Sequence, residues 1–309
     1  MKTGLLFPGQ GSQRVGMGQA LAARFPEAAE TFAEADETLG FALSRLAWEG
    51  PEEILTATEN AQPALYVHSL AVYRVVRARL GPVVGAAGHS LGELSAHAAA
   101  GTFGFAEGLR AVRRRGRLMA RAGESVPGTM AAVLGLGTAE VAELCREADE
   151  ADFTLVAANL NADGQVVFSG DVWGIDWLAR TAKKKGARRV MPLRVSAAFH
   201  SPLMQPAAGG FGSALEEVRF GRPAFPVVSN VTAQAIRDPD RIRESLVRQL
   251  TSPVRWTECI ATLRRMDVTR FMELGPGKVL TGLNRRNAWG IPTRALGTPE
   301  SIDTMEDVA

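Results

Sequence analysis

A serine flanked by glycines is the first feature of the sequence that could do chemistry. Gly88-His89-Ser90-Leu91-Gly92 fits the G-x-S-x-G pattern of a nucleophile elbow. An apolar run at 83–87 precedes it and a segment of helical composition at 91–100 follows it, so Ser90 is predicted at a sharp turn between strand and helix. The glycines let strand and helix approach closely, and the helix N-terminus can stabilise a developing oxyanion. Ser90 is therefore the candidate nucleophile.

A serine needs a neighbouring base to take its proton. The chain has four histidines. His89 adjoins the serine and is expected to point along the turn, whereas His68 and His97 lie in helical stretches as structural or surface residues. His200 falls in a loop that enters the next helix, which makes it the candidate base.

No acid is well placed to complete a hydrolase-type triad. In chain order that acid should lie between serine and histidine, and every aspartate there belongs to a predicted insertion. The sequence therefore favours a Ser-His dyad oriented by amide or backbone carbonyl groups.

One arginine of a predicted helix, 109–121, differs from its neighbours. At about 100° per residue the other arginines of this stretch share one stripe, whereas Arg115 projects among apolar residues. A guanidinium cannot lose its proton to escape burial, so it needs a strong acceptor. Two interpretations remain open, a structural salt bridge with a buried carboxylate and a clamp for a substrate carboxylate.

The elements that position these residues alternate between short apolar strands and longer helices, which is typical of an α/β fold. The stretch from about 129 to 193 has the order βαββαβ, the signature of a small ferredoxin-like unit inserted into the larger part. The tail from about Thr298 is expected to be peripheral. The expected strands are 5–7, 83–87, 130–134, 153–158, 166–169, 188–193, 225–229 and 268–273, and the expected helices of the insertion are 139–148 and 172–185.

Composition narrows the class of protein. The 309 residues are 46% hydrophobic and 22% charged, with 35 basic and 33 acidic residues and a net charge of +2. This composition is typical of a globular enzyme. Its net charge is too small to attract nucleic acid or an anionic membrane surface to the protein as a whole. The opening MKTGLLFPGQGSQ has no secretory leader and no apolar run spans a bilayer, so a cytoplasmic location is expected. Cys145 and Cys259 are interpreted as inert thiols rather than a disulfide or metal site.

Four ordered motifs give the chain a close resemblance to bacterial malonyl-CoA:acyl carrier protein transacylases. The resemblance implies an α/β-hydrolase-like core, 1–126 and 195–309, with a ferredoxin-like subdomain at 127–194. It also implies transfer of a malonyl group from coenzyme A to acyl carrier protein through a malonyl-serine, without a cofactor or metal. The sequence shows no obvious heptads, so a monomer is expected. The motifs are Phe7-Pro8-Gly9-Gln10-Gly11-Ser12-Gln13, Gly88 to Glu93, Ala198-Phe199-His200-Ser201-Pro202 and Gly275-Pro276-Gly277-Lys278-Val279-Leu280.

The resemblance assigns roles position by position. Ser90 matches the acyl-carrying serine and His200 its base, while Arg115 matches the arginine that grips the malonyl carboxylate. The amides of two residues match the oxyanion hole, the carbonyl of a third matches the group that orients the histidine, and two asparagines match a pair near the pocket rim. These residues are Gln10 and Leu91, Gln249, and Asn159 and Asn161.

Three alternatives remain. A serine esterase or thioesterase shares the elbow and base but has no need of Arg115. The acyltransferase of a polyketide pathway uses the same chemistry with another carrier or a branched extender, although the bulk of Phe199 favours malonyl over methylmalonyl. A catalytically silent carrier-binding subunit does not need an intact Ser90 and His200 pair.

Overall fold

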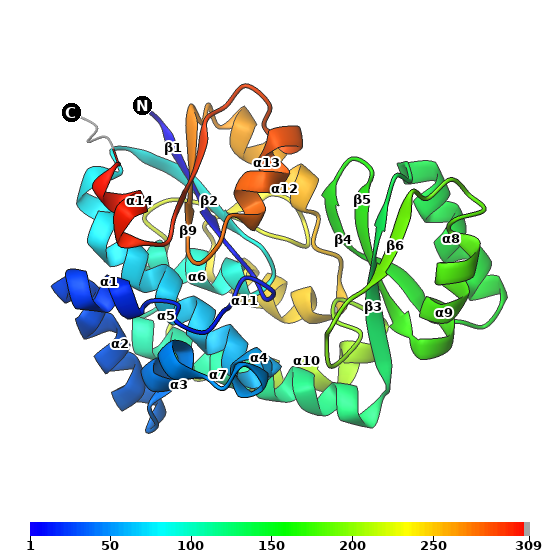
Figure 1. Cartoon of the computed structure of the whole chain (residues 1–309), viewed down its shortest axis with the longest axis horizontal. Coiled ribbons are helices and arrows are strands. Elements are labelled where there is room, and N and C mark those ends of the chain that lie inside the picture. Colours follow the sequence, from blue (N-terminus) through cyan, green and yellow to red (C-terminus); the bar gives the residue numbers. More distant parts are fainter. Residues whose placement is uncertain (306–309) are drawn as a thin grey trace.

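The computed structural model describes residues 1–305 and has a mixed α/β architecture, as predicted. A six-stranded sheet has the order β10-β9-β1-β2-β7-β8, and its pairings are parallel except that between β7 and β8. A separate four-stranded antiparallel sheet has the order β4-β5-β3-β6 and lies on the other side of the molecule in Figure 1. The strands of the larger sheet are β1 (Thr3–Phe7), β2 (Val83–Gly88), β7 (Val227–Val228), β8 (Ala235–Ile236), β9 (Arg270–Leu274) and β10 (Thr293–Leu296).

Helices cover both faces of the larger sheet, so its central strand is buried on both sides. In β1, Leu5 and Phe7 belong to the core cluster that includes α5 and α6, whereas Leu6 belongs to the cluster formed with α12 and α13. The helices of this larger part are α1 (Gln19–Arg24), α2 (Pro26–Leu39), α3 (Leu43–Glu49), α4 (Glu52–Thr56), α5 (Thr58–Val76), α6 (Leu91–Ala99), α7 (Phe105–Ser125), α10 (Gln205–Glu216), α11 (Pro239–Arg248), α12 (Trp256–Arg265), α13 (Val279–Asn287) and α14 (Pro299–Asp303), with short 3₁₀ turns at Arg77–Arg79, Pro202–Met204 and Gln249–Thr251.

The smaller sheet has its own core and a second face toward the larger part. Val133 and Phe168 pack beneath α8 and α9 in a separate cluster, whereas Met130 on the opposite face joins the main core. The element order strand, helix, strand, strand, helix, strand is the predicted one. Its members are β3 (Gly128–Leu134), α8 (Thr138–Glu150), β4 (Leu155–Ala162), β5 (Gln165–Asp171), α9 (Val172–Thr181) and β6 (Arg189–Pro192).

Several bounds differ from the sequence prediction: α7 spans Phe105–Ser125 rather than 109–121, and the strand expected at 225–229 is shorter, Val227–Val228. Helix α9 ends at Thr181 rather than 185, and the chain then turns through Gly186, whose φ is 96°. Strand β4 continues past 158 because it pairs with β5 as far as Ala162↔Gln165. Leu160 also donates a backbone hydrogen bond to the Val254 carbonyl at 2.9 Å, which ties the smaller sheet to the segment before α12. The tail is not peripheral up to 305, since Ile302 is fully buried in the main core; residues 306–309 lie outside the described part.

Candidate active site

Ser90 occupies a strained turn between β2 and α6. Its φ is 53° and its ψ is −108°, a conformation that persists only where neighbouring groups hold it. Asn230 supplies that restraint, because its Oδ1 accepts from the Ser90 amide at 2.8 Å and its Nδ2 donates to the Gly88 carbonyl at 2.8 Å. A Cβ on Gly92 would lie 2.1 Å from the Phe7 carbonyl oxygen, so this position requires glycine. The elbow is therefore built as the sequence predicts.

The imidazole of His200 lies against the Ser90 hydroxyl. Its Nε2 is 2.7 Å from Ser90 Oγ, and its Nδ1 is 2.8 Å from the backbone carbonyl oxygen of Gln249. Because a carbonyl only accepts, Nδ1 must carry the hydrogen, and Nε2 is left to accept from the hydroxyl. Burial, with a smaller contribution from Arg115, lowers the pKa of His200 to about 3. The imidazole is thus neutral at pH 7 and able to take the serine proton.

The other three histidines point away from the Ser90 hydroxyl. His89 Nε2 is 2.9 Å from Asn161 Oδ1, His68 Nε2 is 3.1 Å from the Gly297 carbonyl, and His97 Nδ1 is 3.1 Å from Thr102 Oγ1. His68 and His97 are buried, so they are structural rather than surface residues. Of the four, His200 is the one that contacts the nucleophile.

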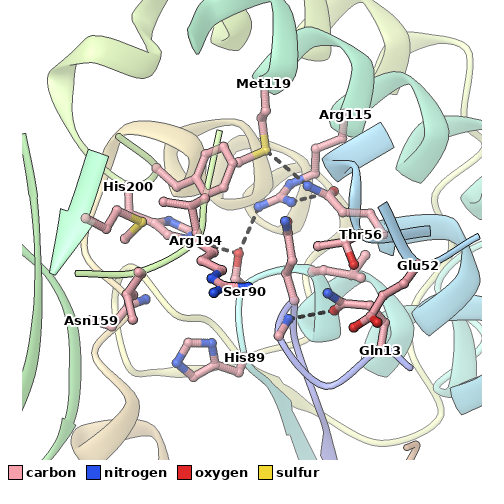
Figure 2. Close-up of a pocket in the computed structure, with 18 residues that line it drawn as sticks. Gln13, Glu52, Thr56, His89, Ser90, Arg115, Met119, Asn159, Arg194 and His200 are labelled. Atoms are coloured by element: carbon pink, nitrogen blue, oxygen red, sulfur yellow. Dashed lines mark hydrogen bonds between the residues drawn. The ribbon is translucent and has the colours of Figure 1, made fainter. Parts of the chain in front are cut away.

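Arg115 is fully buried and reaches the same hydroxyl from α7 (Figure 2). Its Nη2 donates to Ser90 Oγ at 3.1 Å and to Gln249 Oε1 at 2.8 Å, and its Nη1 donates to Gln62 Oε1 at 2.7 Å. Burial lowers its pKa to about 10, so it stays charged at pH 7. Within residues 1–305 no salt bridge pairs this guanidinium with a carboxylate, which disfavours the structural salt bridge.

These side chains surround a cleft of about 470 Å³. Gln10 and Leu91 both line it, and the amide of Leu91 begins α6, where the helix dipole favours negative charge. Neither amide donates a hydrogen bond to another described residue. Asn159 lines the cleft as well, whereas Asn161 is turned toward His89. An apolar wall completes the cleft, formed by Met119, Met130, Leu193, Val195 and Phe199.

Sequence reasoning missed the side chains behind the elbow. Gln249 was expected to act through its carbonyl, yet its side-chain Nε2 also donates to the Ser90 carbonyl at 3.0 Å and to Glu93 Oε2 at 2.6 Å. Glu93 in turn accepts from the Asn230 amide at 3.1 Å. Glu93 directly follows the G-x-S-x-G pattern, and a carboxylate on the first turn of a buried helix was the signal available for it.

Nothing in residues 1–305 suggests a metal centre, because no group of three or more candidate ligands gathers there. Cys145 and Cys259 are free thiols. Among the described helices, none combines the length and apolar character that a membrane crossing needs.

The buried histidines make the fold sensitive to acid. Burial lowers the pKa of all four histidines, to about 3 for His97 and His200 and to about 4 for His68, so below pH 6.5 the unfolded chain binds protons at these histidines that the folded chain does not. Glu93 opposes them, since burial raises its pKa to about 7 and the folded chain takes up one proton first. The net uptake of protons on unfolding should make the free energy of unfolding fall as the pH falls from 6.5 to 5, by roughly 3 kcal/mol per pH unit. Urea unfolding between pH 5 and 6.5 measures this slope, and a flat free energy would contradict it.

With this geometry in place, the chain can be compared with known proteins. Residues 5–287 match the acyl transferase domain family. The malonyl CoA-acyl carrier protein transacylase of Bacillus subtilis (strain 168) is 43% identical over 302 residues, covering 98% of this chain and 95% of the relative. The protein of the same name from Escherichia coli (strain K12) is 42% identical over 298 residues, covering 96% of each.

Solved structures agree over the same length. An acyl carrier protein S-malonyltransferase from Vibrio cholerae superposes with a TM-score of 0.94 at 40% identity, covering 99% of this chain and 100% of the other. A malonyl-transacylase in complex with a type II PKS acyl-carrier protein superposes with a TM-score of 0.94 at 40% identity, covering 98% of each chain.

Proposed function

The chain belongs to the malonyl CoA-acyl carrier protein transacylase family, and from this membership we propose how its residues carry a malonyl group from coenzyme A to the phosphopantetheine thiol of an acyl carrier protein. One observation supports the proposal above all others. The Ser90 hydroxyl lies 2.7 Å from the His200 imidazole and 3.1 Å from the Arg115 guanidinium, so nucleophile, base and cation meet at one atom. A base suits attack on a thioester, and a buried cation suits an acyl group that ends in a carboxylate.

The first half-reaction forms the acyl-enzyme. Ser90 Oγ attacks the thioester carbonyl carbon while His200 Nε2 takes the hydroxyl proton, and the amides of Gln10 and Leu91 hold the tetrahedral oxyanion. The carbon–sulfur bond then breaks, and the departing thiolate of coenzyme A takes the proton from His200. A malonyl-serine ester remains. A positioned general base contributes roughly 10²- to 10⁴-fold and each oxyanion donor roughly 10²- to 10³-fold.

The second half-reaction reverses these steps with the carrier thiol. His200 takes the thiol proton, the sulfur attacks the ester carbonyl, and Ser90 leaves with the proton returned to its oxygen. The kinetics are therefore ping-pong. Throughout, the substrate carboxylate pairs with Arg115, the Gln249 carbonyl keeps the imidazole oriented, and the reaction needs no cofactor.

We assign the fold in finer terms on the same basis. Residues 1–126 and 195–305 form an α/β-hydrolase-like core, and 127–194 form a ferredoxin-like subdomain; the predicted end of the core at 309 lies outside the described residues. The strand order β4-β5-β3-β6 with two helices on one face supports the second assignment. The cleft is lined both by Met130 and Asn159 of the smaller sheet and by Ser90 of the larger part, so substrate would lie between the two.

Fatty acid synthesis is the proposed pathway, in the cytoplasm and with the chain acting as a monomer. The relative bound to a type II PKS carrier keeps a polyketide pathway as the second candidate. A thioesterase fits less well, because a charged guanidinium beside the nucleophile contributes nothing to the hydrolysis of thioesters whose acyl groups carry no carboxylate.

Intact mass spectrometry tests the function directly. Mixing the protein with malonyl-CoA should add one malonyl group, and adding holo acyl carrier protein should move it to the carrier. Acetyl-CoA should give far less adduct than malonyl-CoA. Rapid loss of the adduct to water without any thiol would instead support a thioesterase, and transfer to a polyketide carrier alone would support the second pathway.

A further inference from the structure

A buried carboxylate behind the elbow has no part in the transfer steps above. Glu93 lies in the first turn of α6, is fully buried and does not line the cleft. Its Oε2 accepts from Gln249 Nε2 at 2.6 Å and from the Asn230 amide at 3.1 Å. Its Oε1 has no hydrogen-bond partner in the described part of the chain. A buried carboxylate is costly, so its presence beside the nucleophile calls for a physical account.

The hydrogen bonds around the Gln249 side chain allow one orientation of its amide. The Ser90 carbonyl only accepts, and Glu93 Oε2 already accepts from the Asn230 amide, so both require the amide nitrogen of Gln249. The amide oxygen must then face Arg115, whose Nη2 lies 2.8 Å away. A flipped amide would place its NH₂ group against the guanidinium, donor against donor, and would lose the bond to Glu93.

This orientation determines how Arg115 is held. Two neutral oxygens, Gln62 Oε1 at 2.7 Å and Gln249 Oε1 at 2.8 Å, accept from the guanidinium. A carboxylate in direct contact would fix the arginine equally well but would cancel the charge that a substrate carboxylate needs. With the Gln249 amide between them, the charge of Glu93 stays one side chain removed from Arg115.

We propose that Glu93 is a positioning residue for malonyl recognition: its carboxylate oxygen fixes the amide of Gln249, and that amide holds Arg115 with its charge available to the substrate. The inference rests on the proposed function and extends it to a residue that touches no substrate. It concerns the acceptor oxygen at position 93 rather than its charge.

Two substitutions separate oxygen from charge. Glu93→Met removes both, so the Gln249 amide loses an acceptor and Arg115 loses its fixed position. Glu93→Gln removes the charge but can place an amide oxygen where Oε2 lies. The ratio of malonyl-CoA to acetyl-CoA acylation rates, measured in single turnover by intact mass, should fall about tenfold or more in the methionine variant. In the glutamine variant this ratio should be restored to within about threefold of the unsubstituted protein.

Glu273→Met is the matched control. Like Glu93, Glu273 is fully buried and does not line the cleft. It accepts from the amides of Leu280 and Thr281 at 3.0 and 2.7 Å rather than from Gln249. Its loss should lower the melting temperature without changing the malonyl to acetyl ratio. If Glu93→Met lowers the malonyl-CoA and acetyl-CoA acylation rates by the same factor, as a general loss of folding would, the proposal is wrong.

A double-mutant cycle with Gln249→Leu completes the test, and the single Gln249→Leu variant does not depend on the folding of Glu93→Met. That variant keeps the backbone carbonyl for His200 but has no amide, so its malonyl to acetyl ratio should already be low, and adding Glu93→Met should lower it no further. An unchanged ratio in Gln249→Leu, or an equal fall in Glu93→Gln and Glu93→Met, would overturn the inference. Failure of the proposed function itself is distinguishable, because the unsubstituted protein would then form no malonyl adduct.

Discussion

Ser90→Ala protein is expected to form no covalent adduct with malonyl-CoA, and its transfer rate should fall by at least about 10⁴-fold. The reason lies in the geometry of one oxygen. Ser90 Oγ is the atom that both His200 Nε2 and Arg115 Nη2 contact, at 2.7 and 3.1 Å. Without it the base has no proton to take and the acyl group has no acceptor, although the cleft and the clamp remain. Intact mass after mixing with malonyl-CoA measures the adduct.

Ser95→Ala is the matched control for this variant. Ser95 lies in the same helix α6, is buried, and has no hydrogen-bond partner for its hydroxyl in the described part of the chain. Its loss should leave the adduct unchanged. A malonyl adduct at normal yield on Ser90→Ala would refute the assignment of the nucleophile and, with it, the ping-pong scheme.

The parts of this site that could be predicted from the sequence depend on local patterns. The elbow is a run of five residues whose strand and helix are neighbours in sequence, so Ser90 and its turn follow from spacing. Arg115 follows from helical periodicity, because one face of α7 is apolar and this guanidinium lies on it. The α/β class likewise follows from the alternation of apolar runs.

The parts that could not be predicted depend on contacts between distant segments. Gln249 Nε2 meets the Ser90 carbonyl across 159 positions and Glu93 across 156, and no periodicity in one sequence pairs them. Burial of Ile302 depends on the surface that it meets, so polar neighbours made the tail look peripheral. The backbone contact between Leu160 of β4 and Val254 likewise joins distant segments.

Arg115→Ala is expected to lower malonyl transfer by about 10²- to 10³-fold, as the loss of one partner of a buried charge pair does. Uncharged acyl groups should lose little, because they make no use of the guanidinium, so the preference for malonyl-CoA over acetyl-CoA should largely disappear. Lysine is no conservative replacement, since it cannot present the planar fork that contacts Gln62, Gln249 and Ser90 together. Acylation rates with both thioesters measure the change in preference.

Arg114→Ala is the natural control, because Arg114 is the preceding residue of α7 and is exposed. It should leave the ratio of malonyl to acetyl rates unchanged. Unchanged malonyl specificity in Arg115→Ala would defeat the clamp and with it the Glu93 inference, which acts through this guanidinium. The Ser90 and His200 dyad would survive that result, since its contacts do not pass through Arg115, and the chain would then remain an acyltransferase whose choice of acyl group has another cause.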